Sequence, residues 1–156
     1  MGAVRFYHLT ETGLEGVAPA LLEKALERGM RAAVRIGPGA RIDAVDALLW
    51  AYDDAAFLPH GRADAPHAAR QPVLLTEGRE APNAPDALML LGGAPWSPEE
   101  AEALERVWLI FDGADAAAVE AARADWRRVA AAGLAAEYWA QAGGRWVRKA
   151  VSAEGA

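Results

Sequence analysis

The sequence contains no cysteine, only two serines and only two lysines. Without cysteine the chain cannot form a disulfide or a thiolate metal site. Neither Ser97 nor Ser152 lies in a nucleophile elbow, so the sequence gives no sign of a serine hydrolase. No uncharged apolar run reaches about 18 residues, so no segment is predicted to cross a membrane. No basic and apolar leader precedes the first predicted strand, and we therefore expect a soluble, cytoplasmic protein.

Positive charge is also scarce. There are 22 acidic residues against 16 basic ones, and the formal net charge is −6 at pH 7. Because nucleic-acid binding normally requires a basic footprint, we expect no direct binding of DNA. Fourteen of the basic residues are arginine, whose planar guanidinium group suits carboxylates and phosphates.

The order of apolar segments predicts the fold class. At 156 residues and 53% hydrophobic composition, the chain is long enough for one domain, residues 1–156, with its own core. Strands are predicted over 4–9, 32–36, 73–76, 87–91 and 106–111, and helices over 17–28, 42–52, from Ser97 onward and over 114–132. This alternation predicts an α/β three-layer sandwich that resembles a Rossmann topology, with a largely parallel sheet and short C-terminal strands.

The C-terminal part is harder to assign. Segments 135–140 and 145–151 are joined by Gly143-Gly144, which favours either a hairpin or an irregular extension. We therefore treat residues 140–156 as a C-terminal extension, with an added strand as one outcome.

The motifs of nucleotide-binding and catalytic sites are missing. The turn after the first strand has two glycines at the wrong spacing for GxGxxG, and its Glu11 and Glu15 would repel phosphate. The pair Asp53-Asp54 at a helix end is more typical of a solvated surface than of catalysis. The histidines have no acidic neighbours at metal-ligand spacing. We expect no catalytic residue, cofactor or metal, although a small-molecule- or nucleotide-binding α/β enzyme domain remains the alternative.

Two segments indicate binding. Residues 48–60 end a helix in large aromatics and continue apolar up to a proline, where an ordinary connection would turn polar. Trp50 and Phe57 therefore either cover the core or line a surface recess. Arg123, Trp126 and Arg127 have the i, i+3, i+4 spacing of one helix face. Trp126 either packs on the sheet between two solvated arginines or walls a site for an aromatic group and a carboxylate.

Together, these motifs resemble a known family, the chi subunit of bacterial DNA polymerase III, from about residue 4 to residue 139. The residues that carry the resemblance are Phe6-Tyr7-x-Leu9, Ala47-Leu48-x-Trp50, Phe57-x-Pro59-His60-Gly61, Pro72-Val73-Leu74-Leu75, Arg123-x-x-Trp126-Arg127 and Ala132-Gly133. The segment from Trp50 to Gly61 is the most specific of them.

The resemblance implies a Rossmann-like fold that binds no nucleotide. It also implies an accessory subunit of a DNA-directed DNA polymerase with no catalytic site of its own. Such subunits link the clamp loader, directly or through a psi subunit, to single-stranded DNA-binding protein, by holding its acidic C-terminal tail that ends in Pro-Phe. A third hypothesis is an adaptor that binds an unrelated acidic partner.

Carried over to this chain, the resemblance assigns a role to each candidate residue. Trp50 and Phe57 would wall a pocket for the terminal Phe, and Arg123 would bind the terminal carboxylate. Trp126 stands where the family often has Tyr, and Arg127 would meet the acidic residues upstream. The surface for a psi subunit is not located by the sequence.

Overall fold

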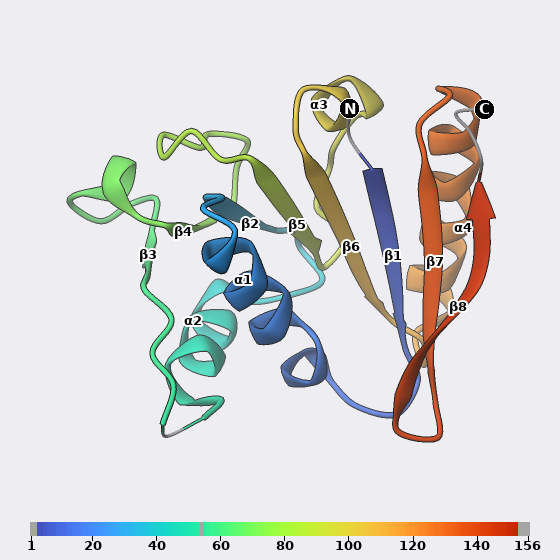
Figure 1. The fold of residues 1–156 in the computed structure, drawn as a ribbon, viewed down its shortest axis with the longest axis horizontal. Helices are drawn as coiled ribbons and strands as arrows, with labels where there is room; N and C mark the ends of the chain where they lie inside the picture. Colours follow the sequence, from blue (N-terminus) through green and yellow to red (C-terminus); the bar gives the residue numbers. More distant parts are fainter. Residues whose placement is uncertain (1–2, 54, 153–156) are drawn as a thin grey trace.

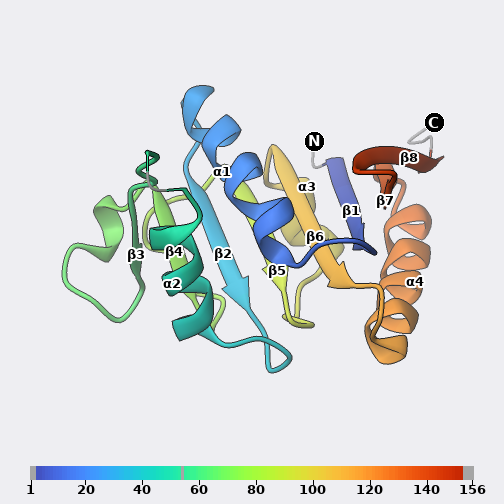
Figure 2. The ribbon, with the colours of Figure 1, turned by 90° about the horizontal axis from the view of Figure 1, so that it is seen from below.

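The computed structural model describes residues 3–53 and 55–152, which form one eight-stranded sheet with helices on both faces (Figures 1 and 2). The strand order is β3-β4-β2-β5-β6-β1-β7-β8, and every neighbouring pair is parallel except the antiparallel pair β7–β8. The strands are β1 (Ala3–Leu9), β2 (Ala32–Ile36), β3 (His60–Arg62), β4 (Val73–Thr76), β5 (Ala87–Leu91), β6 (Arg106–Asp112), β7 (Ala136–Ala142) and β8 (Arg145–Ser152). The predicted α/β sandwich with a largely parallel sheet and C-terminal strands is confirmed.

The helices make the two outer layers. Helices α1 (Ala18–Glu27) and α2 (Ile42–Ala51) bury their apolar residues in the core on one face of the sheet. Helices α3 (Pro98–Glu102) and α4 (Ala116–Ala131) do so on the other face. Two short 3₁₀ helices, η1 (Leu14–Gly16) and η2 (Ala68–Arg70), lie in connections. Every residue of β2, β4 and β5 is buried, as expected for parallel strands covered on both faces.

Local signals explain where the helices on the second face begin. The Ser97 side chain accepts a hydrogen bond from the Glu100 backbone, and the Glu100 carboxylate accepts one from the Ser97 backbone, so the predicted helix start is a capping box. Asp115 caps α4 by accepting from the N–H groups of Ala117 and Ala118. The predicted helix 114–132 is therefore slightly shorter, from 116 to 131.

Strand β3 was not predicted, because three residues are too few to show a periodic pattern. Its pairing with β4 places His60 in the core, where the ring Nδ1 lies 2.7 Å from the Leu58 carbonyl oxygen and Nε2 lies 3.0 Å from Asp46 Oδ1. Strand β3 thus forms one edge of the sheet.

Of the two outcomes considered for the C-terminal part, a hairpin of β7 and β8 is observed. Gly143 and Gly144 both have positive φ, 59° and 76°, as a tight two-residue hairpin turn requires. Asp54 and residues 153–156, which belong to the predicted acidic pair and extension, lie outside the described residues. Within the described ranges, none of the helices has both the length and the apolarity needed to cross a membrane.

Candidate functional site

The predicted face of α4 forms one side of an open recess. Arg123, Trp126 and Arg127 line it together with Tyr138 of β7 and Ala150 of β8, around a volume of about 380 Å³. The helical spacing predicts that Arg123, Trp126 and Arg127 lie together, as they do here. Tyr138 was missed, because its position beside α4 depends on β7 pairing with β1, a contact over more than 130 residues of sequence.

Trp126 is half buried and fulfils parts of both interpretations. Its ring packs edge-on against Phe6 on the sheet, with ring centroids 5.4 Å apart, and against Tyr138 at 6.0 Å. Phe6 is fully buried and stacks on Tyr138 at 6.3 Å. The three rings thus form one cluster, and Trp126 and Tyr138 also line the recess.

The cations at this recess are open to solvent. The Arg123 side chain is 65% exposed, and its single ion pair within the described residues, at 3.8 Å, is with the similarly exposed Glu120, which holds it weakly. Arg127 is exposed and makes no ion pair with any residue that the structure describes. Both guanidinium groups are therefore free to meet an incoming carboxylate.

His8 connects this recess to the sheet. Tyr138 Oη lies 2.9 Å from His8 Nδ1, and the His8 ring stacks on Phe111 at 4.8 Å. Burial, with the charge of Arg123 as a second cause, lowers the pKa of His8. Burial raises the pKa of Tyr138, partly offset by Arg123. At neutral pH both groups are therefore uncharged, and the arginines set the charge of the site.

Trp50 and Phe57 lie elsewhere. They are 56% and 70% exposed, their ring centroids are 5.9 Å apart, and Trp50 also contacts the His60 ring at 4.6 Å. They neither cover the core nor line the recess of α4. We call them the Trp50–Phe57 surface.

The structure therefore does not join the two predicted halves into one site. Helix α2 packs against β4 at one end of the sheet, whereas α4 packs against β6 and β7 on the opposite face at the other end (Figures 1 and 2). The family resemblance and the chemistry of the tail pair the two halves, but the sequence does not show which face of the sheet each crossover helix covers. Their individual roles remain predictions.

In the described ranges, no group of three or more His, Asp or Glu residues is placed to hold a metal ion. The sequence model of a family described as "DNA polymerase III chi subunit, HolC" matches residues 1–137. No curated protein matches the chain. The family match covers the α4 recess up to β7 and ends before Tyr138.

Proposed function

Because the chain belongs to the DNA polymerase III chi subunit family, we propose that this replication accessory subunit links the clamp loader to single-stranded DNA-binding protein and has no catalytic site of its own. In this proposal the acidic C-terminal tail of that protein binds in the α4 recess. The observation that supports it most is the pair of exposed arginines beside an aromatic recess, on a chain whose net charge is −6.

The geometry changes the assignment of roles. Trp126 and Tyr138, rather than Trp50 and Phe57, would wall the site for the terminal Phe, because only they lie beside the arginines. Arg123 would bind the terminal carboxylate with its planar fork, and Arg127 would meet acidic residues upstream.

Physical magnitudes indicate weak binding. Burial of a Phe side chain contributes about 1.5–3 kcal/mol, and a charged hydrogen bond contributes about 1.5–3 kcal/mol. The lower values apply here, because the recess is open and Arg123 is mostly exposed. Even the upper values sum to only about 6 kcal/mol before the ordering of the tail, so a Kd well above 1 μM, with binding that weakens further with salt, is expected.

The first prediction concerns this tail. A fluorescein-labelled acidic peptide ending in Pro-Phe is expected to bind saturably at low salt in fluorescence anisotropy. Arg123→Ala should weaken binding by roughly tenfold, because a charged hydrogen bond is lost. Arg70→Ala is the matched control, since Arg70 is exposed on η2 and makes no ion pair among the described residues. Equal affinity in the two variants would contradict the proposal.

A linking subunit needs a second surface, and the Trp50–Phe57 surface is suited to it. Two neighbouring aromatic rings that are more than half exposed are uncommon on an isolated monomer and are typical of a protein contact. We place the attachment to the clamp loader there, directly or through a psi subunit.

The second prediction separates the two surfaces. A chain carrying Trp50→Ala and Phe57→Ala should lose most of its capture by purified clamp-loader complex, yet bind the tail peptide with unchanged affinity. Val151→Ala, which truncates another exposed apolar side chain, is the control and should change neither. Capture that survives the double substitution would place the attachment on another surface, and tail binding that is lost with it would contradict the separation.

A further inference from the structure

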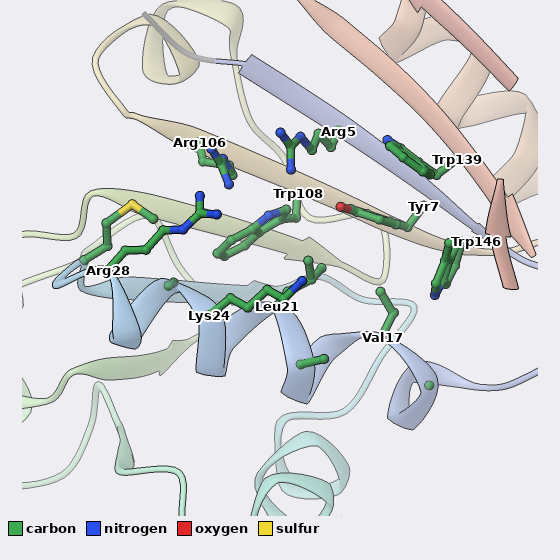
Figure 3. Close-up of a pocket in the computed structure, with 14 residues that line it drawn as sticks. Arg5, Tyr7, Val17, Leu21, Lys24, Arg28, Arg106, Trp108, Trp139 and Trp146 are labelled. Atoms are coloured by element: carbon green, nitrogen blue, oxygen red, sulfur yellow. The ribbon is translucent and has the colours of Figure 1, made fainter. Parts of the chain in front are cut away.

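A second recess lies beside α1, on the face of the sheet opposite to α4 (Figure 3). Its floor is the first half of β1 and β6, its side is α1, and the hairpin β7–β8 closes one end. Its volume is about 340 Å³, within the size range of small-molecule sites. We call it the α1 recess.

Four cations surround this recess: Arg5, Lys24, Arg28 and Arg106. Figure 3 shows the guanidinium groups of Arg28 and Arg106 directed toward the space around Trp108. Arg5 lies 3.4 Å from Glu137, but Lys24, Arg28 and Arg106 make no ion pair with any described residue. So much unpaired positive charge in one place is unusual for a chain of net charge −6.

The cations are close enough to repel one another. Burial, followed by the charges of Arg5 and Arg28, lowers the pKa of Arg106. Clustered guanidinium groups destabilise the folded chain unless an anion lies between them. The grouping therefore favours an anionic ligand.

Two donors on the floor have neither a hydrogen bond nor an ion pair with any described residue. Trp108 is only 1% exposed, and its Nε1 has no hydrogen-bond partner in the part of the chain that the structure describes; the Nε of Arg106 likewise has none there. A buried donor without an acceptor is costly and uncommon in native proteins. A ligand with several acceptor oxygens would pair both donors.

The end of the recess at the hairpin is aromatic. Tyr7 and Trp146 meet edge to face at 5.3 Å, and the indole of Trp139 is held by a hydrogen bond from its Nε1 to Glu137 at 3.0 Å. Aromatic faces of this kind bind planar rings by stacking.

This aromatic wall is held in place by the loop after β1. The Glu11 carboxylate accepts hydrogen bonds from the Gly143 and Gly144 backbone, both at 2.9 Å, and Gln141 Oε1 accepts from three successive N–H groups, those of residues 10–12. Trp139 and Trp146 lie beyond residue 137, outside the family match. The recess is thus built in part from a segment that the match does not describe.

We propose that the α1 recess binds a phosphate monoester joined to a planar ring, as in a nucleoside monophosphate. The phosphate carries nearly two charges and three acceptor oxygens, which suits several guanidinium groups and the indole N–H of Trp108. The ring stacks on the aromatic end. A single nucleotide fits the volume, and the net charge of −6 disfavours a long polyanion.

The position differs from that of a dinucleotide site. Dinucleotides bind outside the carboxyl ends of parallel strands, whereas Arg5 and Arg106 stand near the beginning of β1 and β6. The missing glycine-rich motif after β1, and the expectation that the fold binds no nucleotide, both concern the carboxyl ends of the strands and therefore do not bear on this site.

Isothermal titration calorimetry of the full chain with deoxyadenosine 5′-monophosphate tests the proposal. Saturable binding is expected, with inorganic phosphate alone and deoxyadenosine alone each at least about tenfold weaker, since each supplies half of the contacts. Arg28→Gln and Lys24→Gln, at exposed positions of the α1 side, should each weaken binding by roughly fivefold to tenfold. Arg70→Gln, on the far edge of the sheet, is the matched control and should change nothing.

Two further arms locate the source of the ligand. Oligodeoxynucleotides with and without a 5′-phosphate are titrated in parallel. Binding of both the mononucleotide and the phosphorylated strand shows that the site also accepts strand ends, and binding of the mononucleotide alone assigns it to free nucleotides; both support the proposal. The proposal is overturned if the mononucleotide does not bind, if the Arg28→Gln, Lys24→Gln double variant binds it with unchanged affinity, or if inorganic phosphate binds equally well. Tail-peptide binding should be unaffected in these variants.

Discussion

Replacing Glu100 with alanine is expected to lower the free energy of unfolding by about 3 kcal/mol, because it leaves a buried cation unpaired. Arg35 lies on the central strand β2 and is only 5% exposed. Its Nη2 donates to Glu100 Oε2 at 2.7 Å and its Nη1 to Oε1 at 3.2 Å. Removal of this carboxylate leaves the guanidinium with the Pro95 carbonyl oxygen as its single described acceptor, at 2.8 Å.

Glu100 has two more roles, which the same substitution removes. Its side chain completes the capping box of α3 by accepting from the Ser97 backbone, and it receives a bond from Arg79 at 3.2 Å. Glu99→Ala, one residue earlier on the same helix and exposed, is the matched control and should change stability by less than about 0.5 kcal/mol. Urea unfolding followed by circular dichroism measures both. Equal stability of the two variants would show that Arg35 finds another acceptor.

The Arg35–Glu100 pair also predicts the direction in which the stability of the fold changes with pH. The hydrogen bond from Arg35 is the main cause that lowers the pKa of Glu100 below its usual value of 4.5. The unfolded chain therefore takes up the proton first as the pH falls. The contribution of the pair is fully present above pH 4.5 and is lost as the pH falls through the lower folded pKa, and Glu100→Ala should not show this component.

Replacing Trp108 with alanine is expected to cost about 3–5 kcal/mol, the range for deletion of a large buried side chain. The ring is nearly inaccessible and forms part of the core beneath α1. Trp108→Phe should cost less than half as much, because it keeps most of the volume and the N–H that it removes has no hydrogen-bond partner among the described residues.

The phenylalanine variant also connects stability to the α1 recess. If Nε1 donates to a bound phosphate, Trp108→Phe should weaken the binding of deoxyadenosine 5′-monophosphate while the fold stays intact. Thermal unfolding measures the stability of the variant, and isothermal titration calorimetry measures its binding of the nucleotide. If the Phe variant were as unstable as the Ala variant, the inference that the N–H of Trp108 is unpaired would be contradicted.

The elements that the sequence predicts well are those with strong local signals. Strands such as β2 and β5 are short apolar runs bounded by glycine and proline, and the beginning of α3 follows from its capping box. Strand β3 is stabilised by pairing with β4 rather than by its own sequence pattern, so no local signal in the sequence predicts it.

The sequence predicts which site residues lie together only when they belong to the same helix or strand. Helical spacing places Arg123 and Trp126 on one face, but the separation of Trp50 from them depends on which side of the sheet each crossover helix packs. The α1 recess combines Arg5, Arg28 and Arg106 from three segments that meet only through strand order. A buried arginine such as Arg35 likewise has no sequence signal, because its partner is 65 residues away.

The strand order also bears on how the chain acquires its fold during synthesis. Strand β1 is the first strand made, yet both of its neighbours, β6 and β7, come from the last third of the sequence. Its two hydrogen-bonding edges therefore stay unpaired until residues 106–142 have left the ribosome. Since long-range parallel pairing is slow, we expect β2, β4 and β5 with α1 and α2, a part that is complete by residue 91, to fold first.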